Sequence, residues 1–311
     1  AATANADLVS ESVFEQLDLK RDTHERLDAI CPPATILTTN SSALCVSQIE
    51  DVVARGGQFA ALHTHLGSPL VDIVGGPRTD PGVIDILERY VHSTGGVPLI
   101  LKKEHPGYVL NAMLGPLLGT ALALLLREGY GVEQIDAAWM ASQAAPMGPF
   151  GMMDLFGLGL IRDSWQYREK RDALQELKGD VLELLVPMVE RGELGMKAGA
   201  GFYRYPDPAY QHAGFAENAP DATAYRALQV ALISNAILLA DEDVVEPGDI
   251  DRAWKVGTFL SQGPFQLLQA MGVDSFLAAL ESAVEAQRVA PPMAGRVQRW
   301  LESSTKITGG A

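Results

Sequence analysis

Short apolar segments alternate with helical segments over the first hundred residues. Five segments rich in β-branched and other apolar residues predict strands, at residues 7–13, 35–39, 58–63, 70–74 and 97–101. Apolar residues at helical spacing predict helices at Leu17–Ile30, which Pro32 and Pro33 end, and at Pro81–Ser93. Strands that alternate with helices are typical of a parallel sheet covered on both faces. We therefore expect an α/β domain in this part of the chain.

The pattern changes after His105-Pro106-Gly107. Tyr108–Glu128 is long and apolar at helical spacing, and nearly all of the later sequence predicts helix or turn, apart from Gly201–Tyr205. An all-α part therefore follows the α/β part, with a boundary near residues 103–107.

The helical part contains an internal repeat. Ile135-Asp136-Ala-Ala-Trp139 recurs 115 residues later as Ile250-Asp251-Arg-Ala-Trp254, and Gly148-Pro149-Phe150 recurs as Gly263-Pro264-Phe265. A duplicated helical unit usually packs against its copy and buries a shared face. Pro206–Pro220, rich in Pro, Ala and Asp, is the expected linker between the copies. We predict three domains, at residues 1–103, 104–206 and 221–303.

Composition and charge narrow the range of partners. The 311 residues are 47% apolar, enough for a full core, and the net charge of −15 argues against nucleic acid and anionic membranes. Two cysteines give no framework of disulfides, and no signal peptide is visible, so we expect a cytoplasmic protein. The longest apolar stretch, Leu114–Leu126, is interrupted by Gly115 and Pro116 and is too short to span a bilayer. We expect a buried helix there and no membrane partner.

Two histidines and an acid stand out near the end of predicted strands. In His63-Thr64-His65, residues two apart project from one face of a sheet, and a histidine there can take up a proton near neutral pH. Asp72 is the one charge in an apolar strand, where it lies at the rim or pairs with a histidine and fixes its tautomer. Both could also be ordinary solvated residues. A zinc site needs three or four ligands, so we expect no metal.

Two further polar groups are candidates for substrate contacts. Asn40-Ser41-Ser42 follows a predicted strand, where such residues either make turns and caps or bind a substrate oxygen. Asn111 lies on the first turns of the long apolar helix, where a buried amide needs a partner in the protein or a ligand.

Several segments, taken in order, resemble one family. They are Ala6–Lys20, Thr38–Ser42, Ala61–His63, Pro69–Val74, Pro106–Asn111, Pro146–Phe150 and Lys197–Tyr203. Together they are similar to L-3-hydroxyacyl-CoA dehydrogenases of the 3-hydroxybutyryl-CoA type, and the second helical copy is similar to the duplicated members. The resemblance implies a partial Rossmann-type sheet over residues 1–103. A duplicated helical domain, similar to the C-terminal domain of 6-phosphogluconate dehydrogenase, would follow.

The resemblance also implies roles for individual residues. His63 would be the general base that accepts the hydroxyl proton while a 3-hydroxyacyl-CoA is oxidised by NAD, and Asp72, where the family has glutamate, would orient it. Ser42 and Asn111 would bind the reacting oxygen and the thioester region. Residues matching contacts to the cofactor NAD are Glu15, Lys20, Asn40 and Lys197. An acyl-CoA substrate and a role in fatty acid metabolism follow from this match.

The chain departs from the family in three respects. No G-x-G-x-x-G follows a strand, so the loop that would cradle the NAD pyrophosphate is absent from this sequence. The segment between His63 and Asp72 is about three residues shorter, with Leu66-Gly67 in place of Asn-Pro, and Asp72 is one methylene shorter than glutamate. Because the match joins the family pattern in mid-fold, we expect a fragment of a longer protein rather than a truncated relative.

Two other functions stay open at this point. The absent loop and the shortened segment fit a catalytically impaired acyl-CoA-binding or assembly protein on the same fold. A hydroxy-acid or carnitine dehydrogenase that does not use CoA would share the same motifs. The repeat leaves the oligomeric state as a homodimer or a monomer in which the second copy takes the place of a partner subunit.

Overall fold

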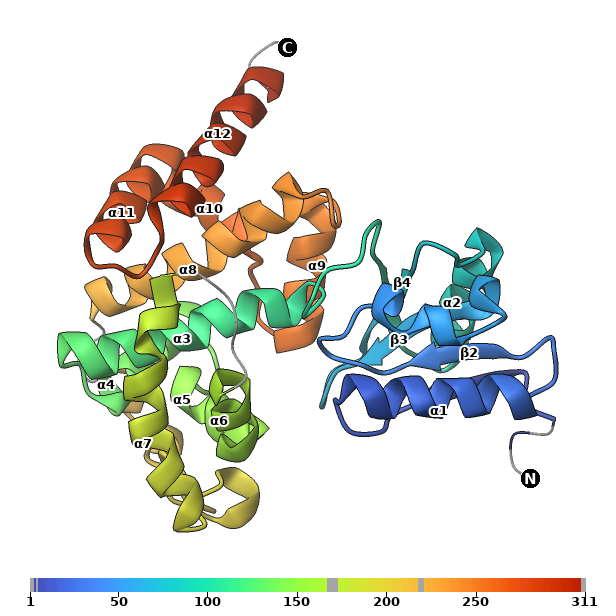
Figure 1. Cartoon of the computed structure of the whole chain (residues 1–311). Coiled ribbons are helices and arrows are strands. Elements are labelled where there is room, and N and C mark those ends of the chain that lie inside the picture. The colour runs from blue at the N-terminus through green and yellow to red at the C-terminus, as the bar shows by residue number, and fades with distance from the viewer. Residues whose placement is uncertain (1–2, 4, 167–172, 218–220, 309–311) are drawn as a thin grey trace. The chain divides into compact units, whose positions relative to one another are not determined.

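The computed structural model describes residues 3, 5–166, 173–217 and 221–308 (Figure 1). It divides into two compact units. The first contains the chain up to Ala112 together with Leu239–Phe259, and the second contains Met113–Leu238 and the chain from Leu260 on. Residues 218–220 of the predicted linker lie outside the described residues.

The first unit contains one five-stranded sheet. Its strands are β1 (Leu8–Glu11), β2 (Ile36–Thr39), β3 (Phe59–Thr64), β4 (Leu70–Gly75) and β5 (Val97–Ile100), in the spatial order β1-β2-β3-β4-β5. All five predicted strands are therefore present, with ends that differ by a few residues. Helices α1 (Leu17–Ile30) and α2 (Pro81–Ser93) have the predicted bounds.

One strand pair differs from the expected parallel sheet. β1, β2 and β3 are parallel and β4 is parallel to β5, but β3 and β4 are antiparallel. Only five residues, His65–Pro69, join β3 to β4. A parallel connection needs a crossover of about a dozen residues, so this short link permits only a hairpin. The sheet is thus parallel-dominated with one reversed pair, and the reversal places His63 directly opposite Asp72.

Alternation along the strands builds an apolar core under α2 and leaves the other face for the candidate site. The residues packed together on the α2 face are Ile36, Ala60, Leu62, Ile73, Val83, Leu87 and Val91. Asp80 starts α2 by accepting a hydrogen bond from the N–H of Gly82 at 2.7 Å. Because neighbouring side chains point to opposite faces, His63 and Asp72, next to Leu62 and Ile73, point away from α2.

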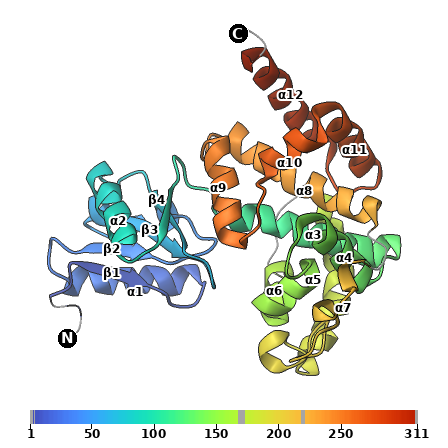
Figure 2. The same ribbon diagram turned by 180° about the vertical axis from the view of Figure 1, so that it is seen from behind.

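The rest of the described chain is helical (Figures 1 and 2). The helices of the first copy are α3 (Leu110–Glu128), α4 (Val132–Gln143), α5 (Pro149–Phe156), α6 (Leu158–Gln166) and α7 (Lys178–Glu190). Those of the second are α8 (Ala222–Asp241), α9 (Pro247–Thr258), α10 (Pro264–Met271), α11 (Val273–Glu285) and α12 (Pro291–Thr308). α9 and α10 have the bounds of α4 and α5 shifted by 115 residues, which confirms the repeat.

Two described helices, α3 and α8, are long and apolar enough to cross a membrane, and the bent pair of α10 and α11 would make a third span if taken together. α3 continues on both sides of Leu114–Leu126 and through Pro116, as the helical spacing of Tyr108–Glu128 predicted. The prediction that this stretch is too short to span a bilayer was wrong, because the whole helix is long and apolar enough to do so. In both helices 67% of the most apolar window is buried within the protein.

Candidate active site

The hairpin of β3 and β4 joins His63 to Asp72. The two residues are opposite each other in register, and His63 Nδ1 lies 2.9 Å from Asp72 Oδ2. His63 is 3% exposed and Asp72 is fully buried. The predicted pair is therefore formed, in the middle of the hairpin rather than at the rim of a strand.

The other nitrogen of His63 faces a hydroxyl. His63 Nε2 lies 3.1 Å from Ser42 Oγ, which follows β2. If Nδ1–H donates to Asp72, Nε2 carries the lone pair and accepts from the serine hydroxyl. This is the tautomer that can take a proton from an alcohol. The structure thus brings together three of the four predicted catalytic residues, Ser42, His63 and Asp72.

Tyr108 covers the imidazole of His63. The two rings are stacked, with centroids 4.8 Å apart, and the Tyr108 hydroxyl donates to the backbone oxygen of Ser41 at 2.7 Å. Burial, followed by the negative charge of Asp72, raises the pKa of Tyr108, so the hydroxyl keeps its proton and remains a donor. Tyr108 was not among the residues predicted from the sequence, although it lies within Pro106–Asn111, a segment that supports the family resemblance.

His65 also contacts the buried carboxylate. His65 Nε2 lies 2.7 Å from Asp72 Oδ2, the same oxygen that His63 contacts. Burial alone would raise the pKa of Asp72, but the hydrogen bonds from His63 and His65 outweigh it and hold the pKa below its usual range. Asp72 is therefore a permanent anion at neutral pH, as a residue that stabilises an imidazolium must be.

The same three side chains form a group that could hold a metal ion, since one ligand atom from each lies within 4.8 Å of the others. From the sequence, His63 and His65 were the only candidate metal ligands, too few for zinc, and no metal was expected. The contacts of 2.7 and 2.9 Å to a single oxygen have the lengths of N–H···O hydrogen bonds. A metal ion would occupy the position of those protons and remove the base at His63.

The two asparagines have different environments. Asn40 Oδ1 accepts from the N–H of Thr64 at 2.8 Å, so this side chain ties the end of β2 to the end of β3. Asn111 is half-buried on the first turn of α3, in the same compact unit. No contact between Asn111 and His63 is found among the described residues, and its role toward the thioester stays a prediction.

Glu15 and Lys20, expected at the cofactor, are both engaged within the protein. Glu15 accepts from the hydroxyl of Ser41 and from the N–H groups of Ala43 and Leu44, the latter two at 2.9 and 3.2 Å, which holds the loop next to Ser42 in place. Lys20 is buried and donates to Glu11 at 2.8 Å, with Glu15 3.6 Å away. Glu11, which was not predicted as a site residue, contacts Lys20, His24 and Thr39.

The residues present offer one feature that suits NAD, an exposed aromatic ring after the carboxyl end of β1. This is Phe14, which is 81% exposed and adjoins Glu15. No glycine-rich turn that leads from a strand into a helix occurs in this chain, so nothing described here cradles a pyrophosphate. Lys197 lies exposed on the short helix Met196–Ala198 of the second unit. The cofactor roles of Glu15, Lys20, Asn40 and Lys197 stay predictions.

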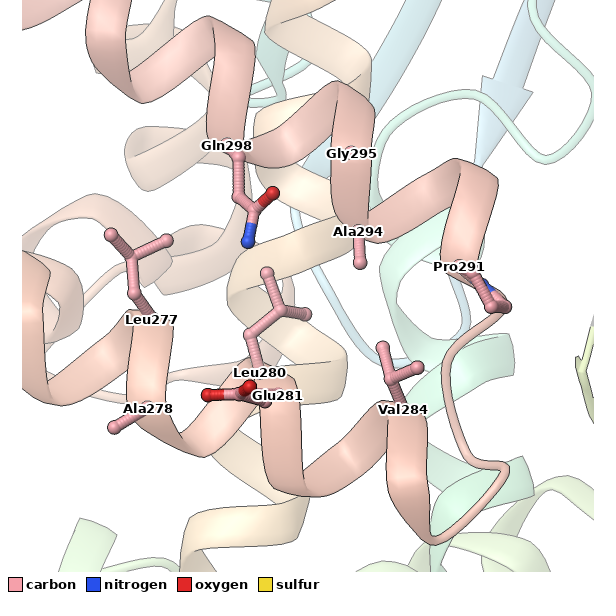
Figure 3. Close-up of a pocket in the computed structure, with 9 residues that line it drawn as sticks. All are labelled: Leu277, Ala278, Leu280, Glu281, Val284, Pro291, Ala294, Gly295 and Gln298. Carbon is pink, nitrogen blue, oxygen red and sulfur yellow. The ribbon is translucent and has the colours of Figure 1, made fainter.

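A separate groove lies in the second helical copy, between α11 and α12 (Figure 3). Its volume is about 460 Å³, and it is lined by Leu277, Ala278, Leu280, Glu281, Val284, Pro291, Ala294, Gly295 and Gln298. The side chains there are mainly aliphatic, and none of the predicted site residues lies in it. The residues predicted for catalysis therefore lie outside this groove, and His63 and Asp72 lie at the hairpin of the first unit.

A sheet that carries a buried acid–histidine pair and is followed by a duplicated helical domain defines the class of the protein. The model of the NAD binding domain of 3-hydroxyacyl-CoA dehydrogenase matches residues 1–104, and that of the C-terminal domain matches residues 107–205 and again 224–307. The chain belongs to the 3-hydroxyacyl-CoA dehydrogenase family. The family resemblance seen in the sequence is thereby confirmed, including the second copy of the helical domain.

Individual relatives agree with this assignment. The chain is 32% identical over 207 residues to the mitochondrial hydroxyacyl-coenzyme A dehydrogenase of Mus musculus. The matched region covers 65% of this chain and 64% of that protein. It is 31% identical over 204 residues to the 3-hydroxybutyryl-CoA dehydrogenase of Clostridioides difficile, covering 64% and 71%. The chain thus spans less than two thirds of the length of the mouse protein.

Solved structures show the same fold. The crystal structure of 3-hydroxybutyryl-CoA dehydrogenase from Escherichia coli covers 97% of this chain and 83% of its own, with a TM-score of 0.76 and 21% identity. A diketoreductase described as acting on dicarbonyl compounds is 36% identical, covers 66% of this chain and 71% of its own, and has a TM-score of 0.60.

Proposed function

We propose that the protein is an NAD-dependent dehydrogenase that oxidises an L-3-hydroxyacyl-CoA to a 3-oxoacyl-CoA. The observation that supports this most directly is the chain of contacts Ser42–His63–Asp72, at 3.1 and 2.9 Å, in a member of this family. NAD, when bound, accepts the hydride from C3 of the substrate. The residues of the chain handle the proton and the positions of the reacting groups.

His63 accepts the proton of the C3 hydroxyl at Nε2, and Asp72 stabilises the imidazolium that forms. The Ser42 hydroxyl lies within hydrogen-bond distance of Nε2. When the substrate oxygen binds beside the imidazole, the same hydroxyl can donate to that oxygen instead. Tyr108 excludes water from one face of the ring, which strengthens the interaction between His63 and Asp72. In the reverse direction His63 returns the proton to the same oxygen.

The test uses acetoacetyl-CoA and NADH, with the loss of nicotinamide absorbance followed in time. Turnover by a protein that contains this chain together with a phosphate-binding βαβ unit supports the proposal. Binding of the CoA ester by calorimetry with no turnover in that protein contradicts it and favours the non-catalytic acyl-CoA-binding alternative.

A second candidate is reduction of a dicarbonyl compound that carries no CoA. The 36% identity to the diketoreductase favours it, because the same pair of groups would serve any ketone beside a second carbonyl. Comparison of acetoacetyl-CoA with ethyl acetoacetate, which has the same reacting group, separates the two. A higher kcat/KM for the ester without CoA selects the second candidate.

We propose further that the protein is a monomer in which the second helical copy takes the place of a partner subunit. In the second unit, Trp139 of α4 lies 6.1 Å from the ring of Tyr225 of α8, measured between centroids. A small cavity is lined by Pro116 and Thr120 of α3 and by Ala231 and Asn235 of α8. The two copies therefore pack on each other through their long apolar helices, the surface that a homodimer would otherwise use.

A further inference from the structure

Two imidazoles share one oxygen of a buried carboxylate. His63 and His65 contact Asp72 Oδ2 at 2.9 and 2.7 Å. The other oxygen, Asp72 Oδ1, is buried and has no hydrogen-bond partner among the described residues. One carboxylate oxygen is therefore the hydrogen-bond partner of both rings.

His65 also holds the ring of His63 in place. The two rings meet edge to face, with centroids 4.5 Å apart and an interplanar angle of 80°. Tyr108 stacks on His63 at 4.8 Å with an interplanar angle of 24°. The His63 ring is thus fixed by an edge contact, a stacked ring and hydrogen bonds at both nitrogens, and it has little freedom to rotate.

The short turn between β3 and β4 brings His65 to this position. Gly67 takes the left-handed conformation, with φ of 72°, and the N–H of Ser68 donates to the oxygen of His65 at 3.3 Å. The Ser68 hydroxyl donates to the backbone of Val256, in the same compact unit, at 3.0 Å. A tight hairpin whose first residue is a histidine therefore folds that imidazole back onto Asp72.

We propose that His65 is a positioning residue: its ring N–H fixes the carboxylate of Asp72, and the edge of its ring fixes the imidazole of His63. The proposal rests on the proposed function of His63. A carboxylate held by a second donor keeps Nδ1 of His63 directed at one oxygen, so Nε2 stays aimed at the substrate.

Other charged groups near the two rings are accounted for. Glu15, Cys45 and Glu104 act on Tyr108, and Lys20 is paired with Glu11. Charged residues on α2 are separated from the rings by the sheet. On α9, which belongs to the same unit, Asp249 and Arg252 pair with each other at 2.9 Å. Asp72 is the only acid among the described residues that contacts either ring.

The kinetic test compares wild type with His65→Gln and His65→Phe. Glutamine keeps an N–H donor for Asp72, whereas phenylalanine keeps only the ring. The effect of each variant is measured separately on kcat and on KM, because a loss of positioning should lower kcat and leave KM nearly unchanged.

The conservative variant separates a positioning role from a general loss of stability. His65→Gln should keep kcat within about threefold of wild type, and His65→Phe should lose about tenfold in kcat because Asp72 loses one donor. Equal rates in His65→Phe and wild type, or an equal loss in His65→Gln and His65→Phe, overturn the proposal.

A second measurement does not need turnover. The ring nitrogen signals of the six histidines show by NMR which nitrogen carries the proton. His63 should be the Nδ1–H tautomer in wild type and in His65→Gln, and a mixture of tautomers in His65→Phe. If neither acyl-CoA nor ketone is turned over but this difference is seen, the proposed function fails and the positioning role stands. If the His63 signals show the same tautomer in all three proteins, the inference is wrong whatever the activity.

Discussion

At the scale of single residues, the chemistry depends on His63. The variant His63→Gln keeps a polar side chain of similar length and cannot act as a base at neutral pH. Because general base catalysis typically contributes about a hundred- to ten-thousandfold, kcat should fall by a factor in that range while KM changes little. The measurement is acetoacetyl-CoA reduction, with circular dichroism to check the fold. His92→Gln, on an exposed histidine at the end of α2, is the matched control and should keep the wild-type rate. A His63→Gln rate within a few-fold of wild type removes His63 from the mechanism.

A second residue-scale prediction concerns Glu11. Burial would raise the pKa of its carboxyl, but hydrogen bonds from His24, Lys20 and Thr39 lower it from 4.5 to about 2. Glu11→Gln leaves the buried ammonium of Lys20 without its anion, which should lower the free energy of unfolding by about 3 kcal/mol. Urea unfolding at pH 7 measures the change. Asp51→Asn, which breaks the exposed pair with Arg21, is the control and should cost less than about 1 kcal/mol.

The pH dependence of the Glu11 effect has a definite sign. The folded pKa is depressed, so the carboxylate stabilises the folded state at pH values above 4.5, and this contribution is lost as the pH falls toward about 2. The difference between wild type and Glu11→Gln should therefore shrink over that interval. A difference that is constant from pH 6 to pH 2 would show that the ionised carboxylate is not the cause.

Sequence reasoning identified most of the acid–base residues because short motifs reveal which types of side chain stand at the ends of strands. His63, Asp72 and Ser42 were selected, and the structure brings them within hydrogen-bond distance. Tyr108 and the role of His65 were missed, because stacking and the sharing of one oxygen depend on a turn conformation that spacing alone does not show. Lys20 was expected to face a cofactor, but its buried pair with Glu11 could be found only from the three-dimensional packing.

At the scale of elements, the sequence predicted the ends of the helices in the first unit but not the direction of every strand. The bounds of α1 and α2 were predicted because charged and apolar positions alternate clearly and Asp80, Pro81 and Pro32 mark their ends. The direction of β4 was not predicted, although the connection of five residues after β3 is too short for a crossover. Alternating strands and helices favour parallel pairing in general, but the length of the connection from β3 to β4 determines the direction of this pair.

An element-scale prediction concerns the start of α5. Asp136 of α4 is buried and accepts from the N–H groups of Phe150 and Gly151 at 2.9 and 3.0 Å, so it satisfies the first turn of α5. Burial raises the pKa of Asp136 to about 7, although these hydrogen bonds oppose the shift. In the unfolded chain the group loses its proton near 3.8, so stability should fall as the pH rises from about 4 to about 7.

The test follows the urea midpoint between pH 5 and pH 8. Wild type should be less stable at pH 8, and Asp136→Asn, which cannot ionise, should lose most of that dependence. Asp163→Asn, on a half-exposed residue of α6, is the control and should keep the wild-type dependence. An Asp136→Asn variant with an unchanged pH dependence would exclude Asp136 as its source.

At the scale of the whole molecule, the repeat and the charge together predict the state of association. If the second copy covers the apolar helices of the first, as the packing of α4 and α3 on α8 indicates, that surface is not available to a second chain. Sedimentation velocity should then give the mass of one chain at all concentrations tested. The net charge of −15 would keep copies apart at low salt even if a dimer surface existed, so the measurement must be repeated at about 1 M salt, where the screening length is about 3 Å. A dimer that persists at high salt contradicts the monomer, whereas a single species at both salt concentrations attributes the absence of association to the covered surface and not to repulsion.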